Sequence, residues 1–409
     1  MTPHNFFSRV SVVLLFISIV LVFIITFQSH CRINSVICNR LIHIIYLQVF
    51  IVLNIFSLAL ILVYLSTYVE RLVPERACGY GKNLLSKHLH KLFGQTFRKY
   101  LVYLCDNGPC GEWTDRLQGI VMSYFLAKLT KRKFAIMSTS PIKLDKLMEP
   151  VLVNWTFDRS NVIHGSCAVY DFLSNPSELL QKLESVDLDQ EFPEDVVYFR
   201  LSKFSWSRLH TNRKYRERVD HIGNGTAKAF YQLIHDILRL NKRMLYQFIV
   251  YKNQFKPKAV DRLVCAVVEG IEGPLGEANT KALWGFLDQY KHEARTKVVV
   301  SSTDNKLLDL AIVRYTDHFM SMPGVLSKFD TGEELRYRIL DNLRQIILDF
   351  YTLVECNTLV LTCGSDLGKL SAITRYAHAD VHYLHSGKVW PTTVETLGRD
   401  FETGKCTVI

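Results

Sequence analysis

The sequence lacks the residue patterns that hold structural metals or read nucleic acids. Its 409 residues contain no C-x-x-C pair and no cysteine and histidine quartet with zinc-ligand spacing, so we set zinc aside. The formal net charge is +10, but the basic residues are scattered and are not interleaved with aromatic residues in a nucleic-acid-binding motif. No internal repeat or low-complexity tract is present. The positive charge therefore fits a membrane surface or a small anionic ligand better than a nucleic acid.

The long apolar runs lie near the N-terminus, at residues 10–27 and 41–68. Both are long enough to cross a hydrocarbon core at about 1.5 Å of helix per residue. Arg9 precedes the first run, as in a signal peptide, but the run is long for one and no small-x-small cleavage site follows. We therefore expect retained membrane helices. Two segments without paired charges argue against a transporter or channel.

One or both of these segments span the membrane. If both do, the connection 28–40, which contains Arg32 and Arg40, lies on the cytoplasmic side by the positive-inside rule. If only the second spans, the N-terminus is cytoplasmic. In both cases the remainder of the chain faces the lumen, so we expect a protein of the Golgi or ER membrane. N-glycosylation sequons at Asn154 and Asn224 agree with this location.

Eight of the ten cysteines lie beyond the apolar segments, and an even number in an oxidising compartment permits disulfide bonds. Cys105 and Cys110 flank a turn at a separation that a disulfide can close. The other pairings stay open at this point. The eight cysteines are Cys78, Cys105, Cys110, Cys167, Cys265, Cys356, Cys363 and Cys406.

The stretch 110–137 contains a glycine loop, a helix and a strand in unbroken order. Apolar residues from Leu117 to Leu129 recur at helical spacing, which predicts an amphipathic helix of about five turns. The basic run 131–133 is predicted to lie in the last turn, where cations suit the helix dipole, and 134–137 is a short apolar strand. This order indicates the opening of an α/β layer.

The glycine loop places Asp115 and Arg116 at the N-terminus of that helix, where backbone N–H groups can hold an anion. The alternative is that Asp115 caps the helix and Arg116 is solvated or ion-paired. Arg200, at the end of the apolar strand 196–200, also has two interpretations. It is either an exposed charge at a strand end or a contact to a substrate.

The second half of the chain alternates strands and helices, which predicts a parallel sheet wound by helices, with a ligand site at the carboxyl ends of the strands. Thr303 and Asp304 follow one strand, and Gly364 and Ser365 follow another. The alternatives are a helix cap for Asp304 and a turn residue for Ser365. Strands are predicted at 263–268, 297–301 and 358–362, and helices at 281–292, 306–314, 333–355 and 369–377.

Two groups of motifs resemble the fucosyltransferase-like glycosyltransferases. Residues 111–136 read G-x-W-x-D-R-L-x-G-I, a helix, and then K/R-x-F-x-I, which is similar to the N-terminal signature of that family. The second half is similar to the GDP-binding half of α1,6- and related fucosyltransferases. Its motifs are W-x-F-L-x-x-Y at 284–290, T-D at 303–304, L-L-x-x-A at 307–311 and D-x-x-x-L-x-x-C-x-x-L-V-L-T-x-x-S at 349–365. The resemblance covers roughly residues 100 to 377 and is specific in order and spacing.

The resemblance implies a GT-B architecture, in which a donor binds between two Rossmann-like domains and no metal or other cofactor is required. It implies transfer of fucose from GDP-fucose to a glycan or glycoprotein hydroxyl by an inverting mechanism. In the family a carboxylate after a strand binds guanine or ribose, a position that Asp304 matches, and Gly364 and Ser365 match the loop beside the phosphates. The residues that we assign to donor binding are Asp115, Arg116, Arg200, Thr303, Asp304, Gly364 and Ser365.

One position departs from the family pattern. The first strand of the second half ends in the family with an arginine that holds the donor diphosphate, and this chain has Glu269 there. A carboxylate repels the diphosphate and loses the bidentate contact of the arginine, and Asp366 adds a second negative charge. Glu269 is also our candidate catalytic base. The alternative function is a catalytically inactive, glycan-binding or partner-binding protein that keeps the scaffold.

We therefore expect an α/β chain with two Rossmann-type domains behind one or two membrane helices. The predicted regions are a membrane anchor at 1–72, a stem at 73–99, an N-terminal α/β domain at 100–225, connecting helices at 226–258, a C-terminal nucleotide-binding domain at 259–385 and a tail at 386–409. The expected partners are a sugar nucleotide, a glycan or glycoprotein acceptor and the membrane, without nucleic acid.

Overall fold

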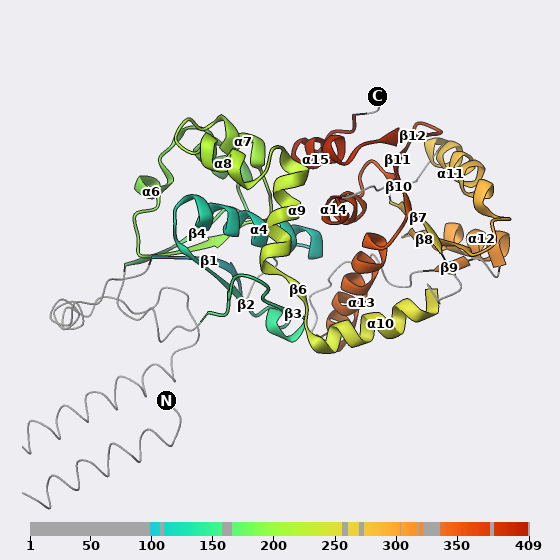
Figure 1. Ribbon diagram of the computed structural model, residues 1–409, viewed down its shortest axis with the longest axis horizontal. Coiled ribbons are helices and arrows are strands. Elements are labelled where there is room, and N and C mark those ends of the chain that lie inside the picture. The colour runs from blue at the N-terminus through green and yellow to red at the C-terminus, as the bar shows by residue number, and fades with distance from the viewer. Residues whose placement is uncertain are drawn as a thin grey trace, which may run out of the picture. The chain divides into compact units, whose positions relative to one another are not determined.

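A computed structural model describes a large part of the chain beyond residue 98 (Figure 1). The described residues are 99–106, 110–157, 166–255, 261–269, 274–302, 304–316, 319–321, 336–376 and 380–407. All of them belong to one compact unit, Ala77–Ile409. The predicted membrane segments and the stem lie outside the described residues. Within the described part, no helix is both long enough and apolar enough to cross a membrane.

The first half of the described chain contains a four-stranded parallel sheet in the order β2-β1-β5-β4. All six residues of its central strand β1 are buried, which is typical of a parallel strand covered on both faces. The strands are β1 (Tyr100–Cys105), β2 (Lys133–Ser138), β4 (Cys167–Asp171) and β5 (Val196–Arg200). The helices are α4 (Trp113–Leu129), α5 (Pro176–Ser185), α6 (Leu188–Glu191), α7 (Trp206–Thr211) and α8 (Arg216–Ile222), with a 3-10 turn η2 (Leu144–Lys146).

The second half, in its described residues, contains a six-stranded sheet in the order β12-β11-β10-β7-β8-β9. The β11–β12 pair is antiparallel and the other pairs are parallel. The strands are β7 (Arg262–Val268), β8 (Thr296–Ser302), β9 (Phe319–Ser321), β10 (Thr358–Thr362), β11 (Asp380–His385) and β12 (Lys388–Thr392). The helices are α11 (Pro274–Leu287), α12 (Asn305–Tyr315), α13 (Arg336–Val354), α14 (Asp366–Arg375) and α15 (Val394–Thr403), with a 3-10 turn η4 (Asp288–Tyr290).

Strand β7 shows how the second sheet separates two cores. Cys265 and Val267 pack into a core with α13 and α14, whereas Val264 and Ala266 pack into another core with α11 and α12. This alternation follows from the two-residue period of a strand. The prediction of a parallel sheet wound by helices is therefore confirmed for this half.

Two helices and a short ladder connect the halves, and the chain then returns to the first half. The connection consists of α9 (Thr226–Ile237), β6 (Arg239–Leu240), which pairs with β3 (Met148–Glu149), and α10 (Lys242–Phe255). Near the C-terminus α15 packs on both α9 and α14. The range 386–409, which the sequence analysis assigns to a tail, thus contains β12 and a helix that joins the two halves.

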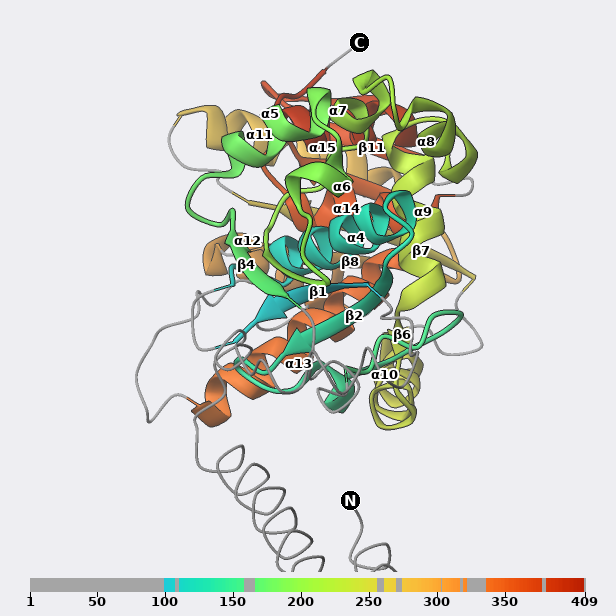
Figure 2. The ribbon, with the colours of Figure 1, turned by 90° about the vertical axis from the view of Figure 1, so that its left-hand side faces the viewer.

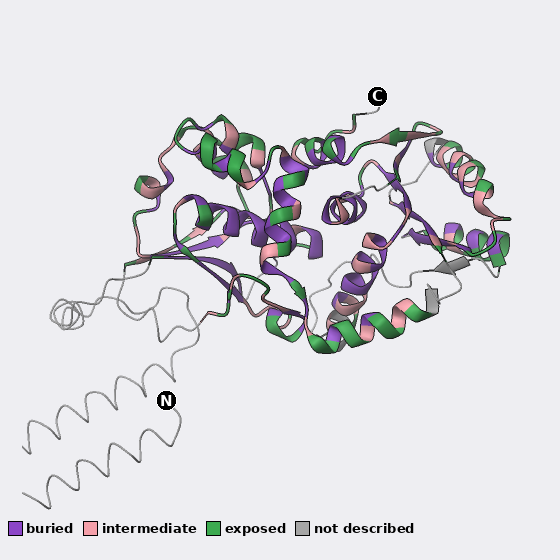
Figure 3. Cartoon of the chain, viewed as in Figure 1, coloured by how far each residue is buried: buried purple, intermediate pink, exposed green. Residues whose placement is uncertain are grey.

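The sequence predicts an amphipathic helix α4, and this prediction is wrong, because 15 of its 17 residues are buried (Figure 3). It lies beside α14 in both views and also contacts α9 and α13, so the second half covers the side that we expected to face solvent (Figures 1 and 2). Gly119 allows α4 to pack closely against the chain after β5, since a Cβ atom there would collide with the carbonyl oxygen of Leu201.

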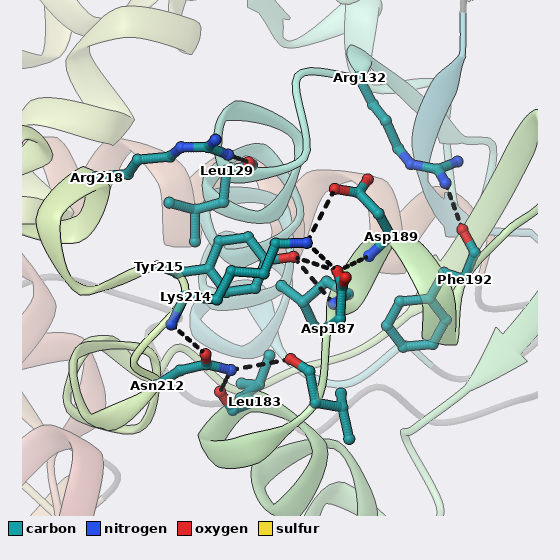
Figure 4. Close-up of polar contacts among 12 residues, drawn as sticks. Leu129, Arg132, Leu183, Asp187, Asp189, Phe192, Asn212, Lys214, Tyr215 and Arg218 are labelled. Carbon is teal, nitrogen blue, oxygen red and sulfur yellow. Dashed lines mark hydrogen bonds and ion pairs between the residues drawn. The ribbon is translucent and has the colours of Figure 1, made fainter.

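The basic run 131–133 does not lie in the last turn of α4, which ends at Leu129. Instead Arg132 is buried and donates hydrogen bonds to the carbonyl oxygens of Phe192 and Glu194 (Figure 4). A buried guanidinium needs such acceptors because its charge has left water. The arginine therefore fixes the chain before β5 rather than stabilising the helix dipole.

The polar, basic stretch after β5 is ordered by buried hydrogen bonds (Figure 4). The amide of Asn212, between α7 and α8, donates to the carbonyl oxygens of Leu183 at 2.9 Å and Val186 at 3.0 Å. The hydroxyl of Tyr215 donates to Asp187 at 3.1 Å. These contacts attach α7 and α8 to α5 and α6.

Two disulfides tie loops at the carboxyl ends of strands, and a third joins a strand to the end of a helix. Cys105–Cys110 closes the loop between β1 and α4 with a Cα–Cα distance of 5.8 Å, which confirms the predicted pair. Cys265–Cys356 joins β7 to the end of α13, and Cys363–Cys406 joins the loop after β10 to the chain after α15. The loops that carry several predicted site residues are thus cross-linked.

Candidate functional site

The carboxyl ends of the two parallel sheets meet at one place. Across this place, the charges of Glu112 and Asp366 both act on the carboxyl of Glu269, and Asp366 also acts on Asp115. Glu112 and Asp115 follow β1, whereas Glu269 follows β7 and Asp366 follows β10. Ligands of open α/β sheets bind at such strand ends, so the place where these strand ends meet is the candidate site.

On the first half, Asp115 caps helix α4. The backbone N–H of Glu112 donates to its carboxylate at 3.1 Å in a capping box. Burial raises the pKa of Asp115 above its ordinary value. This agrees with the helix-cap alternative that the sequence offers for Asp115. Its carboxylate is partly exposed.

Arg116 is 7% exposed and bonds to the backbone. Its Nε donates to the carbonyl oxygen of Gly111 at 3.1 Å, and its Nη1 donates to that of Ser140. Burial lowers the pKa of Arg116 from its ordinary value. The guanidinium thus holds the loop before α4 against the chain after β2.

Arg200 ends β5 in a network of ion pairs. It pairs with the buried Asp106, at the end of β1, and with Asp171, at the end of β4, at 3.5 Å. Its charge is therefore balanced by carboxylates of the same sheet.

On the second half, Glu269 lies at the carboxyl end of an inner strand, because β7 lies between β10 and β8. Its backbone N–H donates to Oγ1 of Thr362 at 2.9 Å. Ser365 donates its hydroxyl hydrogen to Oε1 of Glu269 at 2.7 Å, and its Oγ accepts the N–H of Gly368 at 3.1 Å. Ser365 thus caps α14 and orients the carboxylate at the same time.

The electrostatic surroundings of Glu269 are mixed. Burial raises the pKa of its carboxyl above the ordinary value, and the negative charges of Asp366 and Glu112 raise it further. The hydrogen bond from Ser365 and the positive charge of Lys369 act in the opposite direction. A carboxyl with a raised pKa can accept a proton closer to neutral pH, as a general base must.

Asp304 lies at the same edge as Ser365, two strands away across β7. At about 4.8 Å per strand, the two strand ends are about 10 Å apart, which is within the length of a nucleotide. The carboxylate of Asp304 accepts the N–H of Lys306 at 2.9 Å, so it caps α12 as the sequence predicts. Thr303 lies outside the described residues.

Asp304 also lines a groove of about 820 Å³ between α11 and α12. The groove is polar at the end near the strand edge and contains a partly exposed aromatic ring, Trp284, farther along α11. Its lining residues are Gly276, Glu277, Thr280, Lys281, Trp284, Gly285, Asp288, Asp304 and Arg314.

Gly364 is exposed, and a Cβ atom built on it would have no neighbour within 4 Å. The loop between β10 and α14 therefore borders open space at the candidate site. Among the described residues, no group of three or more His, Cys, Asp or Glu side chains could hold a metal ion.

The sequence analysis did not single out three residues of this site, Glu112, Thr362 and Lys369. Lys369 had the clearest signal, since a glycine loop followed by a helix with lysine in its first turn is a common phosphate-binding arrangement. Glu112 and Thr362 belong to the site through spatial neighbours that no local pattern contains.

The structure defines a class of protein, an α/β fold with two sheets whose strands end at one candidate ligand site. Among solved structures, this fold is similar to Arabidopsis thaliana FUT1, an arginine-to-lysine mutant in complex with GDP. The identity is 13%, the match covers 78% of this chain and 80% of that chain, and the TM-score is 0.55. Bradyrhizobium NodZ α-1,6-fucosyltransferase, soaked with GDP-fucose, matches with 10% identity over 72% of this chain and 99% of that chain, with a TM-score of 0.50.

The chain therefore has a fucosyltransferase-like fold, which confirms at the level of the fold the resemblance seen in its motifs. No protein-family model and no curated protein matches the sequence.

Proposed function

We propose that this chain is a membrane-anchored, lumenal glycosyltransferase that transfers fucose from GDP-fucose to a hydroxyl group of a glycan or glycoprotein. The observation that carries the proposal is the partly buried carboxyl of Glu269 at the place where the strand ends of the two sheets meet. The similar structures with this fold contain GDP or were soaked with GDP-fucose, which supports a sugar nucleotide as the ligand.

The proposed reaction is an inverting displacement. The acceptor hydroxyl oxygen forms a bond to C1 of fucose, the bond from C1 to the phosphate oxygen breaks, and GDP leaves with that electron pair. The hydroxyl proton goes to the carboxylate of Glu269, whose raised pKa suits a base. The N-terminus of α14 faces the charge that develops on the departing diphosphate, so no metal is required.

Asp304 and its groove provide a place for the nucleoside part of the donor. A carboxylate at a strand edge accepts hydrogen bonds from guanine N–H groups or ribose hydroxyls. The distance from Ser365 to Asp304 along the edge agrees with a donor whose phosphates lie at α14 and whose base lies at α12.

A second candidate is a non-catalytic glycan-binding or partner-binding protein. The observation that favours it is the hydrogen bond from Ser365 to Glu269. This bond holds a carboxylate at the position where the family has its diphosphate-binding arginine. With Asp366 beside it, this position repels a diphosphate unless a proton or a cation compensates.

Calorimetry on the full chain in detergent separates the two candidates. A transferase should bind GDP and GDP-fucose, and Glu269→Arg should tighten binding by up to about a hundredfold, because it removes a repulsion and adds a fork of donors. Glu269→Arg should nevertheless abolish transfer, since the base is lost. The matched control is Glu217→Arg on the exposed face of α8, which should change neither.

If no form of the protein binds a nucleotide, the transferase proposal is wrong and the non-catalytic candidate remains. If the wild type binds GDP-fucose tightly and Glu269→Arg destroys binding, Glu269 contacts the donor directly and its role as base must be revised.

The lumenal location has its own test. The side chains of Asn154 and Asn224 are exposed, so both sequons should carry glycans on a protein of the Golgi or ER membrane. Endoglycosidase treatment should then increase the gel mobility of the expressed protein. Unchanged mobility, combined with protease access to the C-terminal part in sealed microsomes, would place that part in the cytosol.

A further inference from the structure

We infer that Lys369 replaces the missing arginine and holds the phosphates of the sugar nucleotide at the N-terminus of α14. The inference rests on the proposed function and names the residue that makes a diphosphate acceptable beside Glu269. The cation comes from the helix after β10, whereas the family pattern supplies an arginine at the end of the strand that corresponds to β7.

The side chain of Lys369 is nearly buried, and its ammonium group has no hydrogen-bond acceptor among the described residues. The residue is 2% exposed, and its ion pair among the described residues is with Asp366 at 3.8 Å, which is beyond hydrogen-bond distance. An ammonium group has three donors, and a buried charge normally has acceptors for them. The unused N–H donors of Lys369, close to the strand ends that form the candidate site, indicate a place for an anionic ligand.

The neighbouring backbone supplies further donors. Within the described residues, the N–H groups of Asp366 and Leu367 make no hydrogen bond, whereas those of Gly368 and Lys369 are accepted by Ser365. These two N–H groups open a helix of ten residues, at the positive end of its dipole. Gly364 leaves open space beside them. A phosphate group therefore meets a lysine, two N–H groups and a helix N-terminus together.

The two arginines near these strand ends are already bound. Arg116 donates to backbone carbonyl oxygens, and Arg200 pairs with Asp106 and Asp171. Lys369, by contrast, is close enough to Glu269 for its charge to lower the pKa of that carboxyl. Lys369 is thus the buried cation on the second half that faces the candidate phosphate position.

The carboxylates beside Lys369 make the binding depend on pH. The groups that face Glu269 are Ser365, Asp366 and Lys369 from the β10–α14 segment and Glu112 from the start of α4. When Glu269 is protonated, Lys369 balances Asp366 and the phosphate meets less repulsion. GDP should therefore bind more tightly as the pH falls through the raised pKa of Glu269.

Calorimetry of the full chain with GDP and with guanosine tests the inference. Lys369→Gln should weaken GDP binding at least about tenfold, because a charge-assisted contact is lost, and should leave guanosine binding unchanged. Lys369→Arg should retain most of the GDP affinity. The matched control is Lys306→Gln, which changes an exposed lysine in the first turn of α12 and should alter neither ligand.

A second variant covers the case in which Lys369→Gln does not fold. Asp366→Asn removes the carboxylate that competes for Lys369 and should tighten GDP binding several-fold without changing guanosine binding. Equal GDP affinity in the wild type and in Lys369→Gln or Asp366→Asn would overturn the inference and leave the proposed function intact. If the wild type binds neither GDP nor guanosine, the proposed function itself fails, and the inference with it.

Discussion

The two halves of the molecule treat their buried charges differently. In the first half, the buried Arg116 and Arg132 each donate to two backbone carbonyl oxygens. In the second half, Lys369 has no hydrogen bond, and one carboxylate oxygen of Asp349 has no partner among the described residues. A satisfied buried charge stabilises the fold, whereas an unsatisfied one costs stability and is retained where a ligand or a proton compensates. Lys369 and Asp349 are therefore charges that a ligand or a proton could compensate.

Asp349 gives the largest expected effect. It is fully buried between α13 and α10, where Tyr251 and Gln345 donate to its Oδ1 at 3.1 and 2.8 Å. Burial raises its pKa from 3.8 to about 7. Because the folded pKa exceeds the unfolded one, this group contributes stability below about pH 4, and that stability is lost as the pH rises to about 7.

Asp349→Asn removes this pH dependence. Relative to the wild type, the free energy of unfolding of the variant should rise by about 4 kcal/mol between about pH 4 and pH 8. Urea denaturation at several pH values measures the difference. The control is Asp341→Asn, at an exposed position of the same helix. Parallel pH profiles for Asp349→Asn and the wild type would show that the pKa of Asp349 is not raised in the folded protein.

Arg116→Met tests the satisfied side of the comparison. The substitution leaves the carbonyl oxygens of Gly111 and Ser140 without their donor at a partly buried site, so the free energy of unfolding should fall by about 3 kcal/mol. Arg213→Met, at an exposed arginine before α8, should change it by less than about 0.5 kcal/mol. Chemical denaturation provides both values. Full stability of Arg116→Met with loss of GDP binding would instead make Arg116 a ligand residue.

Glu402 on α15 tests the contact between the halves and has a smaller expected effect. Its carboxylate accepts the hydroxyl of Thr226 at 2.9 Å and the backbone N–H of Ser207 at 3.2 Å, and it also accepts the N–H of Trp206. Glu402→Ala should lower the free energy of unfolding by about 2 kcal/mol. The exposed Glu217→Ala serves as the control. An unchanged denaturation midpoint for Glu402→Ala would mean that apolar packing of α15 alone joins the halves.

The central strands were predictable because each contains a run of apolar residues. Such a run is typical of a parallel strand buried on both faces, and β1, β5, β7, β8 and β10 all contain one, with polar residues confined to the strand ends. The edge strands β4 and β12 have a partly exposed face and a mixed sequence, so no local pattern identified them. Helix α15 was missed for a similar reason, because its short apolar stripe acquires a partner through the return of the chain to α9 and α14.

The sequence by itself determined the order of the central strands and the helices between them, the helix caps at Asp115 and Asp304, and the departure at Glu269. Each of these depends on residues within a few positions of one another. Only the tertiary structure decided which charged side chains have hydrogen-bond or ion-pair partners and which lack them. Arg132 meets its acceptors 60 residues away, and Glu269 meets Ser365 across 96 residues. Burial and hydrogen-bond partners are set by contacts between distant segments, and these contacts separate a structural arginine from a lysine that awaits a ligand.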